Sequence, residues 1–324
     1  MYKVFMDLYY QEKLIAKTAS LYYIKNLNQK QISRILHISQ ATVSRLLDKA
    51  IKNKIVQVSI KNISGSFTDL EEEMCSRFNL TDCVISKNSS NNNQLLHNYL
   101  GTAAAFHLET IINSKDVIGI ASWSETLLNA IDAMHPLKNV NNIKAVQTLG
   151  GVGNSSATEH AVHLLSRFTE LINAEKFYLP ISGIVSKNFD FSALNDKHIE
   201  IVLNLFNKIS LALVGIGSID IFSPLIEKSG NILPKKEMNR LISKGAVGDI
   251  GLQFFDIKGQ KIDISDKYKV IGMTLKQLKK TNNVLAVAGG NHKVNAIIGA
   301  LNTSVINTLI TDPNTAKEII KNVK

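Results

Sequence analysis

Residues 28–47, NQKQISRILHISQATVSRLL, hold two short apolar stripes separated by a break at His37. The side-chain oxygen of Asn28 is suited to accept from the free N–H groups of a helix that begins just after it. Apolar residues then recur on one face of that helix, which the spacing predicts to end near Leu36. This face consists of Ile32, Ile35 and Leu36. The pattern predicts a short helix followed by a tight turn.

A second capping residue, Ser39, restarts the helical pattern after this turn. Upstream, apolar residues at helical spacing predict another helix over residues 10–24, with Asn26 as a stop signal. The stripe behind Ser39 has the i, i+3, i+4, i+7 spacing of a buried helix face. It consists of Val43, Leu46, Leu47 and Ala50. Three helices are therefore expected, the last two joined by a short turn.

The third predicted helix carries small polar residues and one guanidinium on its outward N-terminal half. Small side chains let a helix approach the base edges in the major groove of DNA. We expect Arg45 to bind a guanine, Gln40 to read a base edge, and Thr42 and Lys49 to hold phosphates. The candidate DNA-binding residues are Gln29, Ser39, Gln40, Ala41, Thr42, Ser44, Arg45 and Lys49. Periodicity alone leaves open a helical hairpin with a solvated polar face.

The positive charge of the chain is concentrated near its N-terminus. The formal net charge is +10, and residues 1–60 contain ten Lys and Arg against three acidic residues. The rest of the chain therefore has a net charge of only +3. A basic segment attached to a nearly neutral body predicts a polyanionic partner, bound with salt-dependent affinity. Double-stranded DNA fits both the charge and the helical pattern.

A chain of 324 residues is long enough for more than one domain. The alternating run IVQVSI, residues 55–60, predicts a short strand that ends a DNA-binding domain over residues 1–60. Residues 61–68 are then predicted to be a linker, and residues 69–324 a larger domain. Within the latter, the polar run KNSSNNNQ at 87–94 is expected to be an exposed loop.

The larger domain repeats one theme, in which an apolar, strand-like run ends in Gly or Ser and a helical pattern begins just after it. The repeats are DVIGIASWSETLLNAI (116–131), IKAVQTLGGVGN (143–154), ISLALVGIGSI (209–219), NNVLAVAGGNHKVNAIIGAL (282–301) and SVINTLITDPNTAKEII (304–320). Nearly continuous apolar strands that alternate with amphipathic helices predict an α/β fold, doubly wound around a mostly parallel sheet.

In such sheets, ligands bind outside the carboxyl ends of the strands. Hydroxyls and backbone N–H groups in these loops would bind ligand oxygens, Lys293 would bind a phosphate, and Asp249 would accept from sugar hydroxyls. The candidate effector-binding residues are Ser122, Trp123, Ser124, Glu125, Thr126, Gly150, Gly151, Gly217, Asp249, Gly289, Gly290 and Lys293. Solvation of Lys293, capping by Asp249 and core packing by Trp123 are the structural alternatives.

The sequence gives weaker support for a cofactor site, a metal site or a membrane-spanning segment. The run GGVGNS only partly matches a dinucleotide fingerprint, so we expect no cofactor. Cys75 and Cys83 have neither disulfide nor metal-ligand spacing, and His160 and His163 lack a third ligand, so we expect no metal site. No apolar run approaches the roughly 20 residues of a membrane helix, and the N-terminus does not resemble a signal peptide. These features predict a cytoplasmic protein without a membrane partner.

Residues 19–60, ASLYYIKNLNQKQISRILHISQATVSRLLDKAIKNKIVQVSI, resemble the DNA-binding domain of the SorC family of bacterial sugar-responsive transcriptional regulators. The segments VIGIASWSETL, AVQTLGG, ALVGIGSI, GAVGDIGLQFFD, VIGMTLKQLKK, VLAVAGGNHKVNAIIGAL and LITDPNTA are similar, in the same order, to the effector-binding domain of that family. This domain is related in fold to phosphosugar isomerases and deaminases. The resemblance implies a homodimer or homotetramer whose affinity for operator DNA changes when a sugar, polyol or sugar phosphate binds.

The sequence departs from this family at three points. His37 stands where the turn usually has glycine, a backbone position that favours positive φ. Ser124 and Glu125 stand where many relatives have Gly and then Thr or another small or basic residue, so either Glu125 points away from a phosphate or the effector is less anionic. Leu149 replaces a lysine that forms an imine in one branch of the family, which argues against an imine there.

The alternative function is a sugar-phosphate isomerase or deaminase with an accessory DNA-binding domain. Such chemistry needs a general acid and base, for which Asp249 and His292 are the candidates. Their spacing provides no convincing pair, so we expect a regulator and not an enzyme.

Overall fold

The computed structural model describes residues 2–56, 66–87, 89–90, 92–121, 124–151, 155–190, 196–219, 233–264 and 266–323. The chain divides into two units, Met1–Ile63 and Ser64–Lys324. The predicted strand at residues 55–60 falls mostly outside the described residues.

The described part of the N-terminal unit is helical. Its elements are α1 (Tyr2–Ala19), which continues into the π-helical segment η1 (Ser20–Ile24), then α2 (Gln29–Leu36) and α3 (Gln40–Lys52). The first helix begins at Tyr2 and not at Tyr10 as predicted, because residues 2–9 contain no Gly or Pro to interrupt it. Asn26 ends the segment with a φ of 53°.

Two small apolar clusters hold these helices together. Ile32, Val43 and Leu47 are buried between α2, α3 and the end of the first helix, and Ala50 packs against α1. Ile35, which the pattern places on the same apolar face of α2, is 50% exposed. On a helix of eight residues, the stripe through Ile32 and Leu36 is enough to contact the neighbours, and Ile35 lies at its edge.

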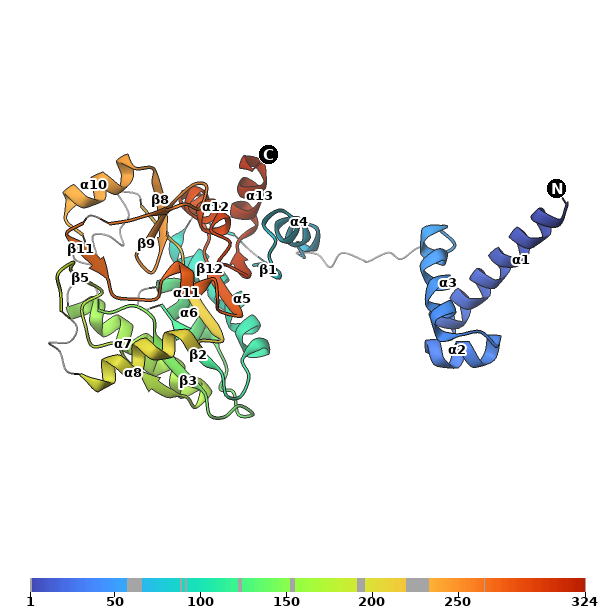
Figure 1. Ribbon diagram of the computed structural model, residues 1–324, viewed down its shortest axis with the longest axis horizontal. Helices are drawn as coiled ribbons and strands as arrows, with labels where there is room; N and C mark the ends of the chain where they lie inside the picture. Colours follow the sequence, from blue (N-terminus) through green and yellow to red (C-terminus); the bar gives the residue numbers. More distant parts are fainter. Residues whose placement is uncertain are drawn as a thin grey trace. The chain divides into compact units, whose positions relative to one another are not determined.

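A seven-stranded sheet forms the centre of the second unit (Figure 1). Its strands, in spatial order, are β1 (Asp82–Ile85), β13 (Thr308–Thr311), β12 (Asn283–Val287), β6 (Leu211–Gly215), β2 (Val117–Ile120), β3 (Lys144–Gln147) and β4 (Glu175–Phe177). Every neighbouring pair is parallel. The predicted parallel α/β fold is therefore confirmed.

Alternate residues of the central strands face two different apolar clusters. In β6, Leu211 and Leu213 contribute to one cluster, and Ala212 and Val214 to the other. The first cluster lies under α5 (Asn93–Ile111), α6 (Glu125–Ala133) and α7 (Ser155–Ile172). The second lies under α4 (Thr68–Phe78), α8 (Lys197–Leu205), α12 (Val294–Asn302) and α13 (Pro313–Asn322). Helices thus cover both faces, as expected for a doubly wound sheet.

The strand order reverses between β2 and β6. From β2 the chain continues to β3 and β4 on one side, and then returns to β6, β12 and β13 on the other. The loops that leave β2 and β6 therefore diverge at the carboxyl edge of the sheet. In open α/β sheets, this reversal is the place where ligands bind.

An antiparallel part, which the strand and helix pattern did not predict, flanks this edge. It comprises a sheet of β10 (Lys261–Ile262), β9 (Gln253–Asp256), β8 (Ala246–Ile250) and β7 (Gly217–Ser218), and a ribbon of β11 (Tyr268–Val270) with β5 (Ile184–Ser186). Gly251 and Leu252, both with positive φ, connect β8 to β9. Such a two-residue turn matches the twist of a hairpin. The β8–β9 hairpin depends on this local turn, whereas the alternation of apolar strands with helices predicts only parallel strands.

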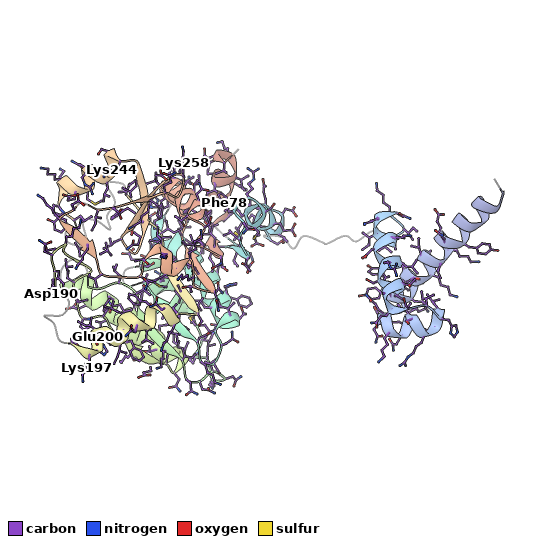
Figure 2. The ribbon with its side chains drawn as sticks, viewed as in Figure 1. Phe78, Asp190, Lys197, Glu200, Lys244 and Lys258 are labelled. Carbon is purple, nitrogen blue, oxygen red and sulfur yellow. The ribbon has the colours of Figure 1, made fainter. Side chains whose placement is uncertain are left out.

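The remaining short helices are η3 (Phe206–Lys208), α10 (Lys235–Ser243), α11 (Leu275–Leu278) and η4 (Asn291–Lys293). Figure 2 shows charged side chains pointing outward from this unit, among them Lys197 and Glu200 of α8, Lys244 and Lys258, all of which are exposed. Within the described residues, no helix combines the length and the apolar content that crossing a bilayer requires.

Candidate functional site

Helices α2 and α3 both have the N-caps that the sequence predicts. The side chain of Asn28 accepts from the backbone N–H of Gln31, and the side chain of Gln31 accepts from the backbone N–H of Asn28, both at 2.9 Å. Ser39 Oγ accepts from the backbone N–H of Thr42 at 3.1 Å. Between the caps, His37 adopts φ 52° and ψ 40°. His37 thus adopts the expected left-handed conformation, and α2 and α3 are joined by a short turn.

One face of α3 is buried and the other is polar and open. Val43, Leu47 and Ala50 face the core. Of the candidate DNA-binding residues, Ser39, Gln40, Ala41, Arg45 and Lys49 are exposed, and Gln29, Thr42 and Ser44 are half-buried. The first turns of α3 therefore present small side chains and one guanidinium on an accessible face.

Two contacts refine the expected roles on this face. Arg45 Nε donates to the carbonyl of Ala41 at 3.3 Å, so the guanidinium lies along the helix. The hydroxyls of Thr42 and Ser39 are 2.8 Å apart and hydrogen-bonded to each other. Thr42 thus helps to stabilise the N-cap of α3. The sequence predicted only a phosphate contact for Thr42 and not this capping contact.

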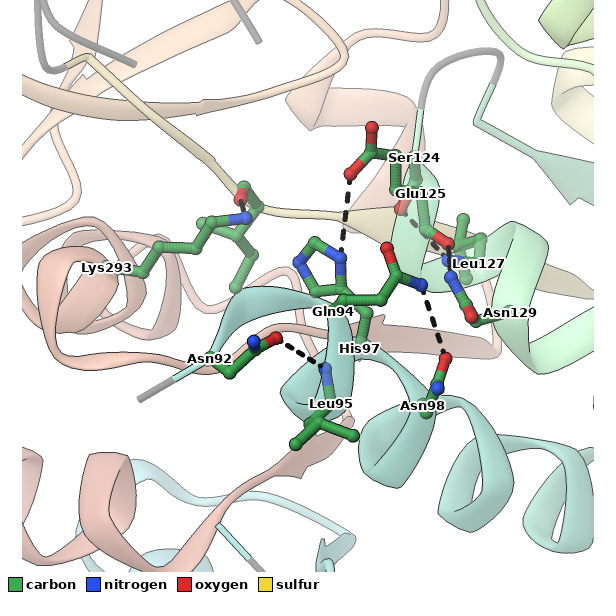
Figure 3. A network of polar contacts seen from close by, with 11 residues as sticks. Asn92, Gln94, Leu95, His97, Asn98, Ser124, Glu125, Leu127, Asn129 and Lys293 are labelled. Carbon is green, nitrogen blue, oxygen red and sulfur yellow. Dashed lines mark hydrogen bonds and ion pairs between the residues drawn. The ribbon is translucent and has the colours of Figure 1, made fainter. Parts of the chain in front are cut away.

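In the second unit, the reversal between β2 and β6 brings together groups from several segments (Figure 3). Ser124 caps α6, and its Oγ accepts from the N–H of Leu127 at 3.1 Å. The end of β6 passes close by, because a Cβ on Gly215 would lie 3.1 Å from Ser124 Oγ. Lys293 reaches the same place from η4, and its Nζ donates to the carbonyl of Ile216 at 3.1 Å.

Carboxylates flank Lys293 at this point. Glu125, the first residue of α6, faces His97 of α5, with Oε2 3.6 Å from His97 Nδ1. Burial lowers the pKa of Lys293, although the charges of Asp249 and Glu125 partly oppose this. Glu125 thus lies against His97, and its charge acts on Lys293.

Asp249 is held by the antiparallel sheet. Its Oδ2 accepts from the N–H of Leu252 at 2.8 Å, within the β8–β9 turn. Gly217 lies opposite Asp249 in β7, and a Cβ there would come within 2.1 Å of Asp249 Oδ1. Burial raises the pKa of Asp249, whereas the Leu252 N–H and the charge of Lys293 lower it. Gly217 thus provides space for the carboxylate.

The glycines of the predicted site are not the free donors that we expected. The N–H of Gly150 donates to the carbonyl of Ile271, and that of Gly151 to the carbonyl of Ile181. The N–H of Gly290 donates to Asp312 Oδ2 at 3.0 Å and to Thr315 Oγ1 at 2.7 Å. These three backbone N–H groups already donate hydrogen bonds within the fold.

The other candidates lie in different surroundings. Thr126 is buried, with 5% of its surface exposed, in the first turn of α6. A Cβ on Gly289 would lie 2.6 Å from Asp312 Oδ2, so Gly289 makes room for that carboxylate. Ser122 and Trp123 lie outside the described residues.

The sequence did not predict a polar hollow of about 120 Å³ that is lined in part by Asn291 and His292, the residues just before Lys293. Its lining consists of Ser89, Ser90, Asn93, Leu96, Gly290, Asn291, His292, Asp312 and Asn314. Within the predicted loop 87–94, α5 begins at Asn93, and Ser89 Oγ donates to Asp312 Oδ1 at 2.8 Å. The sequence DPNT, residues 312–315, predicts a capped helix start. It does not predict which residues from distant parts of the chain lie beside that helix start.

Neither thiol nor metal chemistry stands out in the described part of the chain. No cluster of three or more His, Cys, Asp or Glu suited to a metal is found among those residues. Cys83 is buried and Cys75 is half-buried. Burial, followed by nearby acidic groups, raises the pKa of Cys75, and burial is also the main cause that raises the pKa of Cys83. A raised pKa disfavours the thiolate, which is the nucleophilic form of cysteine.

Comparisons with known proteins agree with this architecture. A family described as "Putative sugar-binding domain" matches residues 61–321, and "Sigma-70, region 4" matches residues 20–53. The deoxyribonucleoside regulator of Bacillus subtilis (strain 168) is 28% identical to the chain, over 97% of this chain and 99% of its own length.

Solved structures match as well. The crystal structure of the full-length sorbitol operon regulator SorC from Klebsiella pneumoniae has a TM-score of 0.72 and 25% identity, covering 95% of this chain and 98% of that one. The "Putative sugar-binding domain of transcriptional regulator DeoR from Pseudomonas syringae pv. tomato" has a TM-score of 0.62 and 32% identity, covering 79% of this chain and 99% of that one. With its helix-turn-helix and its parallel-sheet domain, the chain belongs to the SorC family of sugar-binding transcriptional regulators.

Proposed function

We propose that this regulator binds double-stranded operator DNA of a carbohydrate-metabolism operon in the cytoplasm, as a homodimer or homotetramer. Residues 1–60 would bind DNA, 61–68 would link, and 69–324 would bind the effector and assemble the subunits. Paired α3 helices would then read half-sites about one helical turn apart or a multiple of it, in a roughly palindromic operator. The supporting observation is the capped α2–turn–α3 pair with its accessible polar face.

The effector would bind at the carboxyl edge of the parallel sheet, beside Ser124, Glu125, Asp249 and Lys293. This place is supported by the reversal of strand order and by the convergence of charged side chains from α6, β8 and η4. A sugar, polyol or sugar phosphate bound there changes operator affinity only by as much as it favours one arrangement of the subunits over the other.

We propose binding without turnover. An isomerase or deaminase would need Asp249 and His292 to act as an acid and base pair. Asp249 is instead held by Leu252 and faces Lys293, and His292 is an exposed residue of η4. The relatives described above are regulators by name. Conversion of sugar phosphates by the purified protein would contradict this proposal.

The DNA-binding role is tested with Arg45→Ala. The wild-type protein would first select its preferred sites from a library of double-stranded DNA, and fluorescence anisotropy would then measure affinity for the selected site and its single-base variants. We expect a loss of about 1–3 kcal/mol and relaxed selectivity at one base pair. Arg167→Ala is the matched control, because the Arg167 side chain in α7 is 42% exposed and its ion pair with Asp132 is long, at 3.7 Å. Unchanged affinity and selectivity for Arg45→Ala would refute the recognition-helix assignment.

A further inference from the structure

The start of α6 is the first of two places at the carboxyl edge where an anion would be stabilised. The N-terminus of a helix has free N–H groups and a partial positive charge. In this chain Ser124 Oγ already accepts from Leu127, and Glu125 places its own carboxylate in the first turn. Glu125 is 37% exposed and so remains accessible from the site. A phosphate arriving there would meet a negative charge.

The start of α13 is occupied in the same way. Asp312, only 1% exposed, caps that helix by accepting from the N–H groups of Asn314 and Thr315. It also accepts from the N–H of Gly290, in the turn after β12. A carboxylate of the protein therefore fills the place that a bound anion would need.

The ammonium group of Lys293 already interacts with acidic groups of the protein. The charge of Lys293 acts on the carboxyl groups of Asp249 and Glu125, and its Nζ already donates to the carbonyl of Ile216. A phosphate would have to compete with these protein groups for Lys293.

The polar hollow offers a different chemistry. Besides Asp312 and His292, its polar lining consists of uncharged side chains, and it includes neither Lys nor Arg; these uncharged residues are Ser89, Ser90, Asn93, Asn291 and Asn314. Hydroxyl and amide side chains both donate and accept hydrogen bonds, as sugar hydroxyls do. A hydroxyl-rich ligand therefore fits the hollow better than a phosphate does.

We propose that the effector is an unphosphorylated polyol or free sugar, and that Glu125 is the residue that excludes the phosphorylated form. The inference rests on the proposed effector site at the carboxyl edge. Glu125, which His97 and the start of α6 hold in place, would accept from ligand hydroxyls and repel a phosphate. Lys293 would then serve to balance the two carboxylates, and also to donate to a neutral oxygen.

The test compares matched pairs of compounds on the full chain: sorbitol, fructose, ribose and 2-deoxyribose, each with its monophosphate. Thermal shift finds the compounds that bind, since a ligand of the folded state raises the melting temperature, and calorimetry then measures their affinity. We expect the best ligand to be unphosphorylated, and its monophosphate to bind at least about tenfold more weakly. In Glu125→Gln this difference should shrink by about tenfold, and in Asp132→Asn, at the far end of the same helix, it should remain.

The outcomes separate the two proposals. A phosphorylated compound that binds wild-type protein more tightly than its parent sugar would overturn the exclusion of phosphate and leave the sugar-responsive function standing. The wild-type comparison alone decides this point, even if Glu125→Gln does not fold. An unchanged preference in a folded Glu125→Gln variant would overturn the role of Glu125. If no compound of either series shifts the melting temperature or the DNA affinity, the proposed effector function fails, and this inference with it.

Discussion

Replacement of Asp312 by alanine should destabilise the sugar-binding domain more than the loss of an ordinary helix cap. The carboxylate accepts from Asn314 and Thr315 in its own helix, from Ser89 Oγ at 2.8 Å and from Gly290 N–H at 3.0 Å. The last two contacts tie the segment after β1 and the turn after β12 to α13. Asp312 is therefore both a cap and a link between three neighbouring strands.

The magnitude follows from these contacts. Loss of an N-cap costs about 1 kcal/mol, and a buried hydrogen bond to a charged group contributes about 1.5 kcal/mol or more. The Gly290 N–H keeps Thr315 Oγ1 as an acceptor in the variant, which reduces its share. We therefore expect a loss of about 3 kcal/mol, which corresponds to a fall in melting temperature of roughly 10 °C for a domain of this size.

Urea unfolding of the full chain provides the assay. The fluorescence of Trp123 reports on the second domain alone, because the chain has one tryptophan. Asp196→Ala is the control, since among the described residues the Asp196 carboxylate accepts from His198 and Ile199 of its own helix, and the variant should lose about 1 kcal/mol. A loss in Asp312→Ala no larger than in this control would refute the argument that the long-range contacts matter.

Three further outcomes are expected. First, burial raises the pKa of Asp312, but hydrogen bonds, chiefly from Thr315 and Ser89, outweigh it and leave the pKa below its usual value. The stabilisation is then fully present above the unfolded pKa of about 4 and is lost as pH falls through the lower folded pKa, so the stability gap between wild type and Asp312→Asn should narrow in urea titrations below about pH 4. Second, His37→Gly should stabilise the N-terminal unit by about 0.5 kcal/mol in thermal unfolding followed by circular dichroism, because glycine adopts positive φ without strain; a loss of stability would show that the His37 side chain contributes contacts. Third, Lys293→Ala should weaken binding of the effector found by thermal shift at least about tenfold in calorimetry, since it removes a donor and leaves the carboxylate of Asp249 without its cation; intact affinity would exclude Lys293 from the site.

The sequence by itself determined the elements whose hydrogen bonds are local. The caps at Asn28 and Ser39 bond to groups three residues away, so residue type and spacing were sufficient to predict them. The buried stripe of α3 follows from helical periodicity, and the parallel sheet from the alternation of apolar strands with helices. Each of these features depends on residues that are close together in the sequence, so residue type and spacing are enough to predict it.

The tertiary structure alone decided which groups meet at the candidate site. Ser89 and Asp312 are 223 positions apart and become neighbours because β1 pairs with β13. The engagement of the Gly150, Gly151 and Gly290 N–H groups, and the facing of Glu125 toward His97, likewise depend on strand order and on loops that follow different strands. Strand order is a long-range property, because each pairing is chosen by packing over the whole domain and not by the residues within one segment.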